Sequence, residues 1–299
     1  MNTNVVALRK AAGQSVLLET ITPQLAEKYL ARMVANRPLN QGKSVEYALA
    51  IDEGRWSVNG ETIKFDNDDQ LIDGQHRLQG CVLAGRSFQS YVVRGIHDPN
   101  AFATVDVGKT RNHGDVFGIA GYPQSNLVSV AAMLVYKYKN GILTTSGSNG
   151  RRYVKGSKTI LKKLEKLPVK SVEITKADLL KFAEPFKDRL IAAVREAEKF
   201  RTGKLIATGT VAGCYFLMAE KAEVDAKRFW TDLIEGVGLS SSDPVYWLRE
   251  RLIANMAATH KLQRGAILHL VFKAWNKRRD GERTKTLKIV QGEAFPKIK

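Results

Sequence analysis

Cysteine is scarce in this chain, whose 299 residues include only Cys81 and Cys214. The two lie far apart in the sequence and lack the paired spacing of metal ligands. Disulfide scaffolds and cysteine-rich zinc sites are built from several closely spaced cysteines. The sequence therefore argues against both, and it fits the reducing cytoplasm.

Long apolar runs are also missing. No stretch approaches the roughly 18–20 residues that a membrane-spanning helix needs. Residues 1–13 lack the apolar core and small-residue cleavage site of a secretory signal. With 44% hydrophobic and 26% charged residues, the composition is that of a globular protein without a membrane partner, and the length predicts one or two domains.

Acidic residues are under-represented in one part of the chain only. Residues 1–120 hold 13 Lys and Arg and 13 Asp and Glu, whereas residues 121–299 hold 34 and 17, so the formal net charge of +17 lies entirely in the second part. Residues 137–170 contain ten basic residues and one acidic residue, Glu165. Such a field attracts polyanions and predicts DNA as a partner, the alternative being a basic, solubilising surface.

Two groups of basic residues are the candidates for contact with nucleic acid. The first lies within and just after a segment rich in Gly, Ser and Thr at residues 140–158, which we interpret as a mobile loop or linker. The second lies at the end of a predicted helix. The candidates are Arg151, Arg152, Lys155, Lys158, Lys162, Lys163, Lys277, Arg278 and Arg279.

Periodicity and turn residues predict an α+β fold. A small mixed-sheet domain is expected at residues 15–118, and a basic, all-helical domain at 119–299. In the first domain we predict a strand at 15–21 followed by a helix that Thr22 caps and Pro23 begins. The remaining predicted elements of that domain are a helix at 42–54, strands at 61–65, 70–72 and 90–96, and a helix that Gly85 ends.

The second domain is predicted to be helical over most of its length. The expected helices lie at residues 159–167, 175–201, 207–221, 225–236, 243–258 and 261–279, with a final strand at 286–290.

The segment Leu71–Leu78 joins a predicted strand to a predicted helix through Asp73 and Gly74. A helix that starts after glycine offers its first backbone N–H groups and the positive end of its dipole to an anion. Gly74 permits close approach of a phosphate, and Arg77 can bind two phosphate oxygens. His76 could donate to a phosphate or act as an acid or base, and Asp73 could hold Mg²⁺ or accept a proton. The structural alternative makes Asp73 a helix N-cap and leaves the other two side chains on the surface.

The motif Asp73-Gly74-Gln75-His76-Arg77 resembles the signature turn of the ParB/sulfiredoxin-like superfamily. Partition proteins of the ParB type carry Gly-Glu-Arg-Arg at the phosphates of CTP, sulfiredoxins carry Gly-Cys-His-Arg at the phosphates of ATP, and free serine kinases carry Asp-Gly-His-His-Arg. Gln75 stands where sulfiredoxins have their catalytic cysteine, which excludes reduction of a sulfinic acid. The second arginine of the ParB turn is absent, and the kinase turn is the nearest of the three. The resemblance covers about residues 20–118 and extends to ParB-like proteins of phages and prophages.

The resemblance implies a ParB/sulfiredoxin-like domain that binds ATP or CTP together with Mg²⁺. The implied nucleotide-binding residues are Gly74, Gln75, His76, Arg77, Lys109, Arg111, Arg37 and Asn40. Of these, Lys109 and Arg111 are expected near the γ-phosphate, and Arg37 and Asn40 at the edge of the nucleotide.

Glu61 is a further acidic candidate. It follows the turn dipeptide Asn59-Gly60 and precedes a strand expected beside the phosphate turn. An acid in that place could activate a hydroxyl or bind metal, the alternative being a solvated turn residue.

Three hypotheses of function follow. The first is a nucleotide-binding, ParB-like protein in the cytoplasm of a bacterial host, which engages DNA through its basic helical domain and changes posture or oligomeric state with nucleotide. The second is a phosphotransferase or NTPase in which Asp73 or Glu61 is the base and His76 and Arg77 hold the phosphate. In this hypothesis Mg²⁺, with Asp73 as a ligand, bridges the phosphate oxygens. The third is a ParB-like nuclease.

Overall fold

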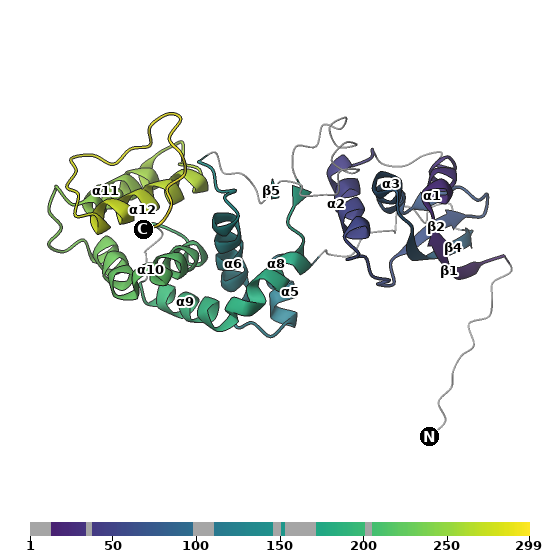
Figure 1. Cartoon of the computed structure of the whole chain (residues 1–299), viewed down its shortest axis with the longest axis horizontal. Coiled ribbons are helices and arrows are strands. Elements are labelled where there is room, and N and C mark those ends of the chain that lie inside the picture. Colours follow the sequence, from purple (N-terminus) through teal and green to yellow (C-terminus); the bar gives the residue numbers. More distant parts are fainter. Residues whose placement is uncertain (1–12, 34–37, 98–110, 146–150, 153–171, 201–204) are drawn as a thin grey trace, which may run out of the picture. The chain divides into compact units, whose positions relative to one another are not determined.

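The computed structural model describes residues 13–33, 38–97, 111–145, 151–152, 172–200 and 205–299. These residues fall into two compact units (Figure 1). Described residues up to 97 belong to the first unit, and those from 111 on, except Val172, belong to the second. Each unit has its own buried apolar core.

A four-stranded mixed sheet in the order β1-β4-β2-β3 forms the base of the first unit. Its strands are β1 (Ser15–Ile21), β2 (Thr62–Asp66), β3 (Leu71–Asp73) and β4 (Phe88–Ile96). β4 is antiparallel to β1 and parallel to β2, and β2 is antiparallel to β3. Alternation along β2 buries Ile63 and Phe65 and puts Lys64 on the opposite face. The predicted α+β class with a small mixed sheet is confirmed.

The described residues of the first unit also form the helices α1 (Pro23–Leu30), α2 (Gln41–Asp52) and α3 (Gln75–Ala84). The Thr22 side chain caps α1 ahead of Pro23, as predicted, and Asn40 caps α2. Gly85, with φ of +67°, ends α3. α3 packs against both α1 and α2. The core beneath them includes Ile21, Ala26, Val45, Leu49, Ile63, Phe65, Leu78 and Val92.

Helices make up most of the described residues of the second unit. They are α5 (His113–Ile119), α6 (Ser125–Lys139), α8 (Lys176–Ala183), α9 (Lys187–Lys199), α10 (Thr208–Glu235), α11 (Pro244–Ala257) and α12 (Arg264–Arg279), with a 3₁₀ turn at Glu184–Phe186. Among the helices of the described ranges, none is both long and apolar enough to cross a bilayer. The prediction of an all-helical second part missed a pair of short strands, β5 (Arg151–Arg152) and β6 (Val172–Glu173). Two residues are too few to leave an alternating pattern in the sequence.

α10 is interrupted at Ala222, whose φ of −158° and ψ of 98° are not helical. The break falls between the helices predicted at 207–221 and 225–236. The helix predicted at 159–167 lies outside the described residues, as does most of the predicted loop at 140–158. Within that loop segment, Asn140 caps α6 and Ile142 is buried.

The boundary between the units lies ahead of α5 rather than after residue 118 as predicted. Phe117 is fully buried in the second core, and its ring centroid is 4.8 Å from that of Tyr122. A short, glycine-containing helix such as α5 has too few apolar residues to indicate from the sequence which core it joins. In the structure α5 packs against α6 and α8.

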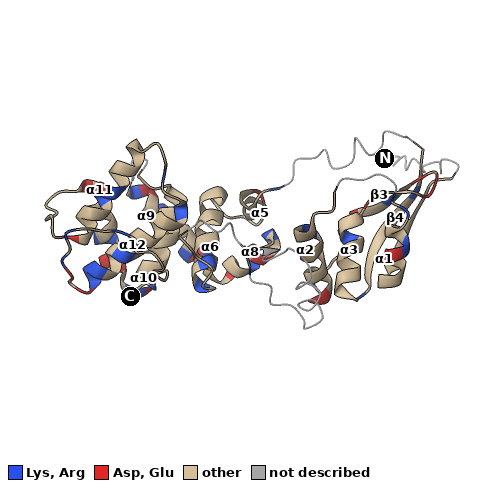
Figure 2. Cartoon of the chain, turned by 90° about the horizontal axis from the view of Figure 1, so that it is seen from above, with Lys and Arg blue, Asp and Glu red and all other residues tan. Residues whose placement is uncertain are grey.

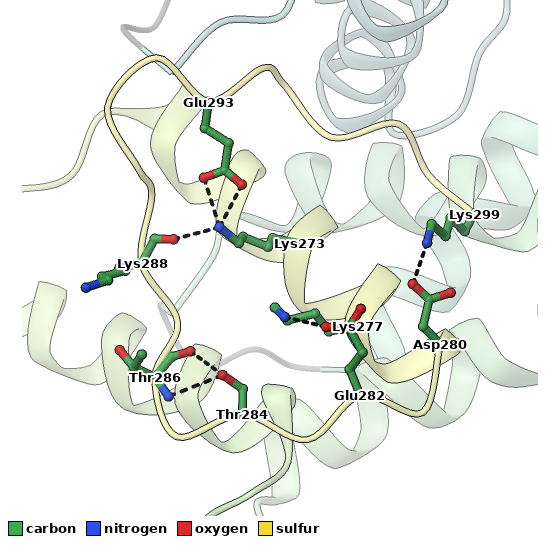
Figure 3. A network of polar contacts seen from close by, with 9 residues as sticks. All are labelled: Lys273, Lys277, Asp280, Glu282, Thr284, Thr286, Lys288, Glu293 and Lys299. Atoms are coloured by element: carbon green, nitrogen blue, oxygen red, sulfur yellow. Dashed lines mark hydrogen bonds and ion pairs between the residues drawn. The ribbon is translucent and has the colours of Figure 1, made fainter.

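Residues 281–299 lie beside α12 without forming a helix or strand (Figure 3). Lys273 Nζ donates to Lys288 O at 3.0 Å and to the Glu293 carboxylate at 2.7 and 2.8 Å. Trp275 Nε1 donates to Lys299 O at 3.0 Å. Side chains of α12 thus bind several backbone groups of this tail, and the strand predicted at 286–290 does not form.

Candidate phosphate-binding site

The turn from β3 into α3 is shaped by Gly74. Its φ of +108° is a left-handed conformation that other residues adopt only with strain. A Cβ at this position would lie 3.0 Å from Ile63 Cγ1 and 3.3 Å from Ile63 Cα, closer than normal contact. Gly74 is also the N-cap of α3 and supplies no capping side chain. The start of α3 is therefore a glycine turn that no residue with a Cβ can form without strain.

Arg77 is the most unusual side chain of the turn, because its guanidinium is buried and only partly satisfied. The residue is 6% exposed. Nη2 donates to Asp73 Oδ2 at 3.3 Å, while Nη1 has Glu61 Oε2 at 3.9 Å, beyond hydrogen-bond distance. Nη1 is buried and, in the part of the chain that the structure describes, has no hydrogen-bond acceptor. Buried donors are almost always paired, so this atom marks a place for a further oxygen.

Asp73 lies between two cations. Its Oδ2 accepts from Lys64 Nζ at 2.6 Å and from Arg77 Nη2. The N-cap of α3 is Gly74, so the alternative prediction that Asp73 caps this helix is wrong. Two cations thus share this carboxylate, and the other acid near Arg77 is the exposed Glu61.

His76 and Asn40 meet at the start of two helices. The backbone N–H of Asn40 donates to His76 Nε2 at 2.9 Å, and Asn40 Oδ1 accepts from the N–H of Lys43 at 3.1 Å. With Nε2 used as an acceptor, the neutral ring carries its proton on Nδ1. This hydrogen bond joins the start of α3 to the start of α2, and His76 is only 9% exposed.

Glu61 is the solvent-facing acid of the site. Its side chain is 63% exposed, and Asn59 Oδ1 accepts a hydrogen bond from its N–H at 3.1 Å. The prediction that Glu61 precedes a strand beside the turn is confirmed, because β2 pairs with β3.

The structure thus brings together five predicted site residues: Glu61, Asp73, Gly74, His76 and Arg77, with Asn40 reached through His76. Gln75, which is 3% exposed, occupies the first turn of α3. Arg37 and Lys109 lie outside the described residues, and Arg111 belongs to the second unit, directly before α5. In the described ranges, no three His, Cys, Asp or Glu side chains are grouped so as to hold a metal ion.

Lys64 stands out in the sequence beside Glu61, but no role was predicted for it. The signal was available, because an alternating strand that buries Ile63 and Phe65 directs Lys64 to the other face. What the sequence could not give is the register that puts Lys64 opposite Asp73.

The predicted nucleic-acid residues at the end of α12 are ion-paired within the second unit. Lys277 Nζ contacts Glu282 Oε2 at 2.5 Å (Figure 3), Arg278 pairs with Asp232, and Arg279 pairs with Asp225. Acidic residues are interspersed with basic ones on these helices (Figure 2). Arg151 and Arg152 form β5, and the remaining candidates, Lys155, Lys158, Lys162 and Lys163, lie outside the described residues.

These contacts give the β3–α3 turn three properties of an anion site: a positive helix end, a glycine that admits close approach, and a buried guanidinium with an unused N–H. A search of protein-family models, of curated proteins and of solved structures found no match to the chain.

Proposed function

We propose that the first unit binds the phosphates of a nucleoside triphosphate at the β3–α3 turn, and that the second unit engages DNA. The observation that carries the first part is the buried Arg77 guanidinium, whose Nη1 lacks a hydrogen-bond acceptor among the described residues. A phosphate oxygen at Nη1 would complete its hydrogen bonding. The resemblance of residues 73–77 to the ParB/sulfiredoxin-like turn supports the same ligand.

Electrostatics at the turn favour a phosphate. Lys64 and Arg77 carry two positive charges against the one negative charge of Asp73, and the N-terminal end of α3 adds a partial positive charge. Glu61 is 3.9 Å from Arg77 but largely solvated, so water screens its charge. In this proposal the phosphate binds Nη1 of Arg77 and competes with Asp73 for Nη2.

Mg²⁺ fits Asp73 poorly in this arrangement. Asp73 Oδ2 already contacts two cationic groups, at 2.6 Å from Lys64 Nζ and 3.3 Å from Arg77 Nη2. A divalent cation there would be repelled by both. Phosphate binding in the proposal accordingly depends on Arg77 and Lys64 and not on a metal ligand.

The DNA-binding part is supported by the charge of the chain, since the net +17 falls after residue 120. Within the described helices, several cations are balanced by acids, as for Lys139 and Arg189, which share Glu220. DNA contact in this proposal therefore involves cations that acids do not fully occupy, together with the basic segment at residues 137–170.

Phosphoryl transfer is a second candidate function of the same turn, and the position of Glu61 favours it. A solvent-accessible carboxylate lies within 3.9 Å of the guanidinium proposed to hold the phosphate. A base that accepts the proton of an attacking hydroxyl is needed beside the transferred phosphate.

Thermal unfolding with a nucleotide panel tests the proposed ligand. The panel is ATP, CTP and GTP, each with and without Mg²⁺, and the proteins are the wild type, Arg77→Gln and the control Arg86→Gln. Arg86 lies beyond the other end of α3, and its side chain is 65% exposed, so both variants lose one charge in the same unit. At about 100 times Kd, a bound nucleotide stabilises by about 2.7 kcal/mol and raises Tm by about 5 °C or more.

The expected result is a rise in the wild type and Arg86→Gln with at least one nucleotide, and none in Arg77→Gln. Absence of any rise in the wild type, or an equal rise in all three proteins, would reject the proposed site. Circular dichroism of Arg77→Gln in the absence of nucleotide establishes that it is folded.

Nucleotide turnover separates the two candidate functions. If Glu61 is a base, Glu61→Gln keeps nucleotide binding and loses about 100-fold or more in phosphate transfer or release, while Glu27→Gln, an exposed acid on α1, keeps both. A wild type that binds nucleotide but neither transfers nor releases phosphate rules out the second candidate and leaves the first standing.

A further inference from the structure

The second unit contains a hollow of about 200 Å³ between the second half of α10 and the end of α12. Its lining is almost entirely charged: Asp225, Arg228, Trp275, Arg278 and Arg279. No part of the proposed nucleotide turn contributes to it, because all five residues belong to the second unit.

Helical spacing explains why these side chains converge. On α10, Asp225, Arg228 and Asp232 are three and four residues apart and share one face. On α12, Trp275 has Arg278 and Arg279 three and four residues ahead. The Arg278–Asp232 and Arg279–Asp225 ion pairs then join the two faces.

Arg278 repeats the feature found at Arg77. One terminal nitrogen, Nη2, donates to Asp232, whereas Nη1 is buried and has no hydrogen-bond acceptor in the described part of the chain. With Nη2 bonded and Nη1 unbonded, the Arg278 guanidinium can still donate to a second oxyanion.

The other two arginines add charge around the same space. Arg279 pairs with Asp225 and lies over the Trp275 ring, with Cζ 5.7 Å from the ring centroid. Arg228 is exposed and has no ion pair with any residue that the structure describes. Counting Asp225 and Asp232 against the three arginines leaves one positive charge. Because the Trp275 N–H is donated to Lys299 O, the indole offers its ring rather than a donor.

We propose that this hollow is a phosphate-binding site of the second unit, in which Arg278 Nη1 and the Arg228 guanidinium hold one phosphate group. The volume of about 200 Å³ is below the roughly 300–1,000 Å³ of pockets that enclose a whole small molecule, so it suits a single phosphate. The phosphate comes either from a nucleic-acid backbone or from a free phosphorylated compound. The first source rests on the proposed function, and the second does not.

Two matched pairs of variants test the site in the full-length protein. Arg278→Gln is compared with Arg283→Gln, since Arg283 is exposed and outside the hollow. Asp232→Asn is compared with Glu250→Gln, an exposed acid on α11. The two variants of a pair have the same net charge. A difference in ligand binding between them is therefore due to the place of one residue in the hollow. The nucleotide turn is untouched in all four variants and cannot produce such a difference.

The nucleic-acid arm measures the anisotropy of a labelled oligonucleotide, single-stranded and duplex, between about 50 and 200 mM salt. The expected result is an affinity about tenfold or more lower for Arg278→Gln than for Arg283→Gln, with a salt slope smaller by about one. Asp232→Asn, which frees Arg278 from its carboxylate, binds more tightly than Glu250→Gln. A role of the ion pair in stability alone would weaken binding in both Arg278→Gln and Asp232→Asn.

The second arm titrates inorganic phosphate and AMP against the same variants and follows Tm. Stabilisation by these compounds that Arg278→Gln loses and Arg283→Gln keeps supports a free phosphorylated ligand, even if no oligonucleotide binds. Equal behaviour within both pairs in both arms overturns the phosphate site. Oligonucleotide binding that persists in that case leaves the proposed DNA contact intact, so the two failures are distinguishable.

Discussion

At the scale of residues, the proposed functions depend on two arginines whose guanidinium groups are only half hydrogen-bonded: Arg77, which is buried, and Arg278, whose side chain is 27% exposed. Arg77 and Arg278 each use one terminal nitrogen on an aspartate and leave the other buried without a hydrogen bond. An unsatisfied buried donor costs about 1–3 kcal/mol, more for a charged group. A phosphate oxygen bound to Nη1 would remove that cost, and we therefore propose a phosphate at both Arg77 and Arg278.

His269 gives a residue-scale prediction about pH. It is fully buried on α12, and burial lowers its pKa, against the opposing effect of Glu293 Oε2 at 3.5 Å. The unfolded chain, with a histidine pKa of about 6.5, then binds more protons than the folded chain below that pH. The stability tied to neutral His269 is complete above about pH 6.5 and is lost as the pH falls further.

The measurement is the free energy of unfolding in urea at about pH 7.5 and 5.5. We expect the wild type to lose more stability between these pH values than His269→Leu, which removes the titrating group from an apolar position beside Phe295. Glu293, whose pKa is lowered from 4.5, titrates below this window. Equal losses in the two proteins would contradict the assignment to His269.

Part of the candidate site could be predicted from the residues alone. Gly74 and Arg77 stand out because a glycine before a helix and an arginine in its first turn are typical of anion sites. The sequence could not reveal that Lys64 would share Asp73 or that Arg77 would be almost entirely buried, since both depend on the pairing of β2 with β3.

At the scale of elements, local signals predicted most of the described helices and strands. Caps such as Thr22 and Asn40 are encoded beside the helices that they begin, so the starts of α1 and α2 follow from neighbouring residues. The tail at 286–290 was mispredicted because Leu287, which is 2% exposed, is buried in the second core and Ile289 packs against that core, while neither residue pairs with a strand. Tertiary packing overrides a short β pattern.

Close packing of α10 on α6 gives the element-scale prediction. A Cβ at Gly213 would lie 2.6 Å from Leu134 Cδ2 and 2.9 Å from Leu134 Cβ. Gly213→Ala is therefore expected to destabilise by about 1–2 kcal/mol, although alanine is favoured in a helix by about 1 kcal/mol. Urea unfolding measures the change.

Gly118→Ala on α5 is the control, because its nearest neighbour is the Ser125 hydroxyl at 3.3 Å, which can rotate. We expect this variant to be neutral or more stable. If Gly213→Ala is as stable as Gly118→Ala, the close contact between α6 and α10 is not present in solution.

At the scale of the whole molecule, composition and structure divide the chain in similar ways. The described residues of the unit with the phosphate turn fall, except for Val172, within the neutral first 120 residues, and those of the unit with the arginine hollow fall mostly in the basic remainder. The unit boundary was misplaced because α5 follows the first domain in sequence but buries Phe117 in the second core. Charge could be counted from the sequence, whereas membership of a core could not.

Arg77, which Asp73 holds by one terminal nitrogen, is proposed to bind a phosphate. Isothermal titration of the best nucleotide from the panel into the wild type, Arg77→Gln and Asp73→Asn tests it most directly. We expect Kd to rise about tenfold or more in Arg77→Gln and to be unchanged or lower in Asp73→Asn, because the competing carboxylate is gone. An unchanged Kd in Arg77→Gln, or an equal loss of affinity in both variants, would contradict it.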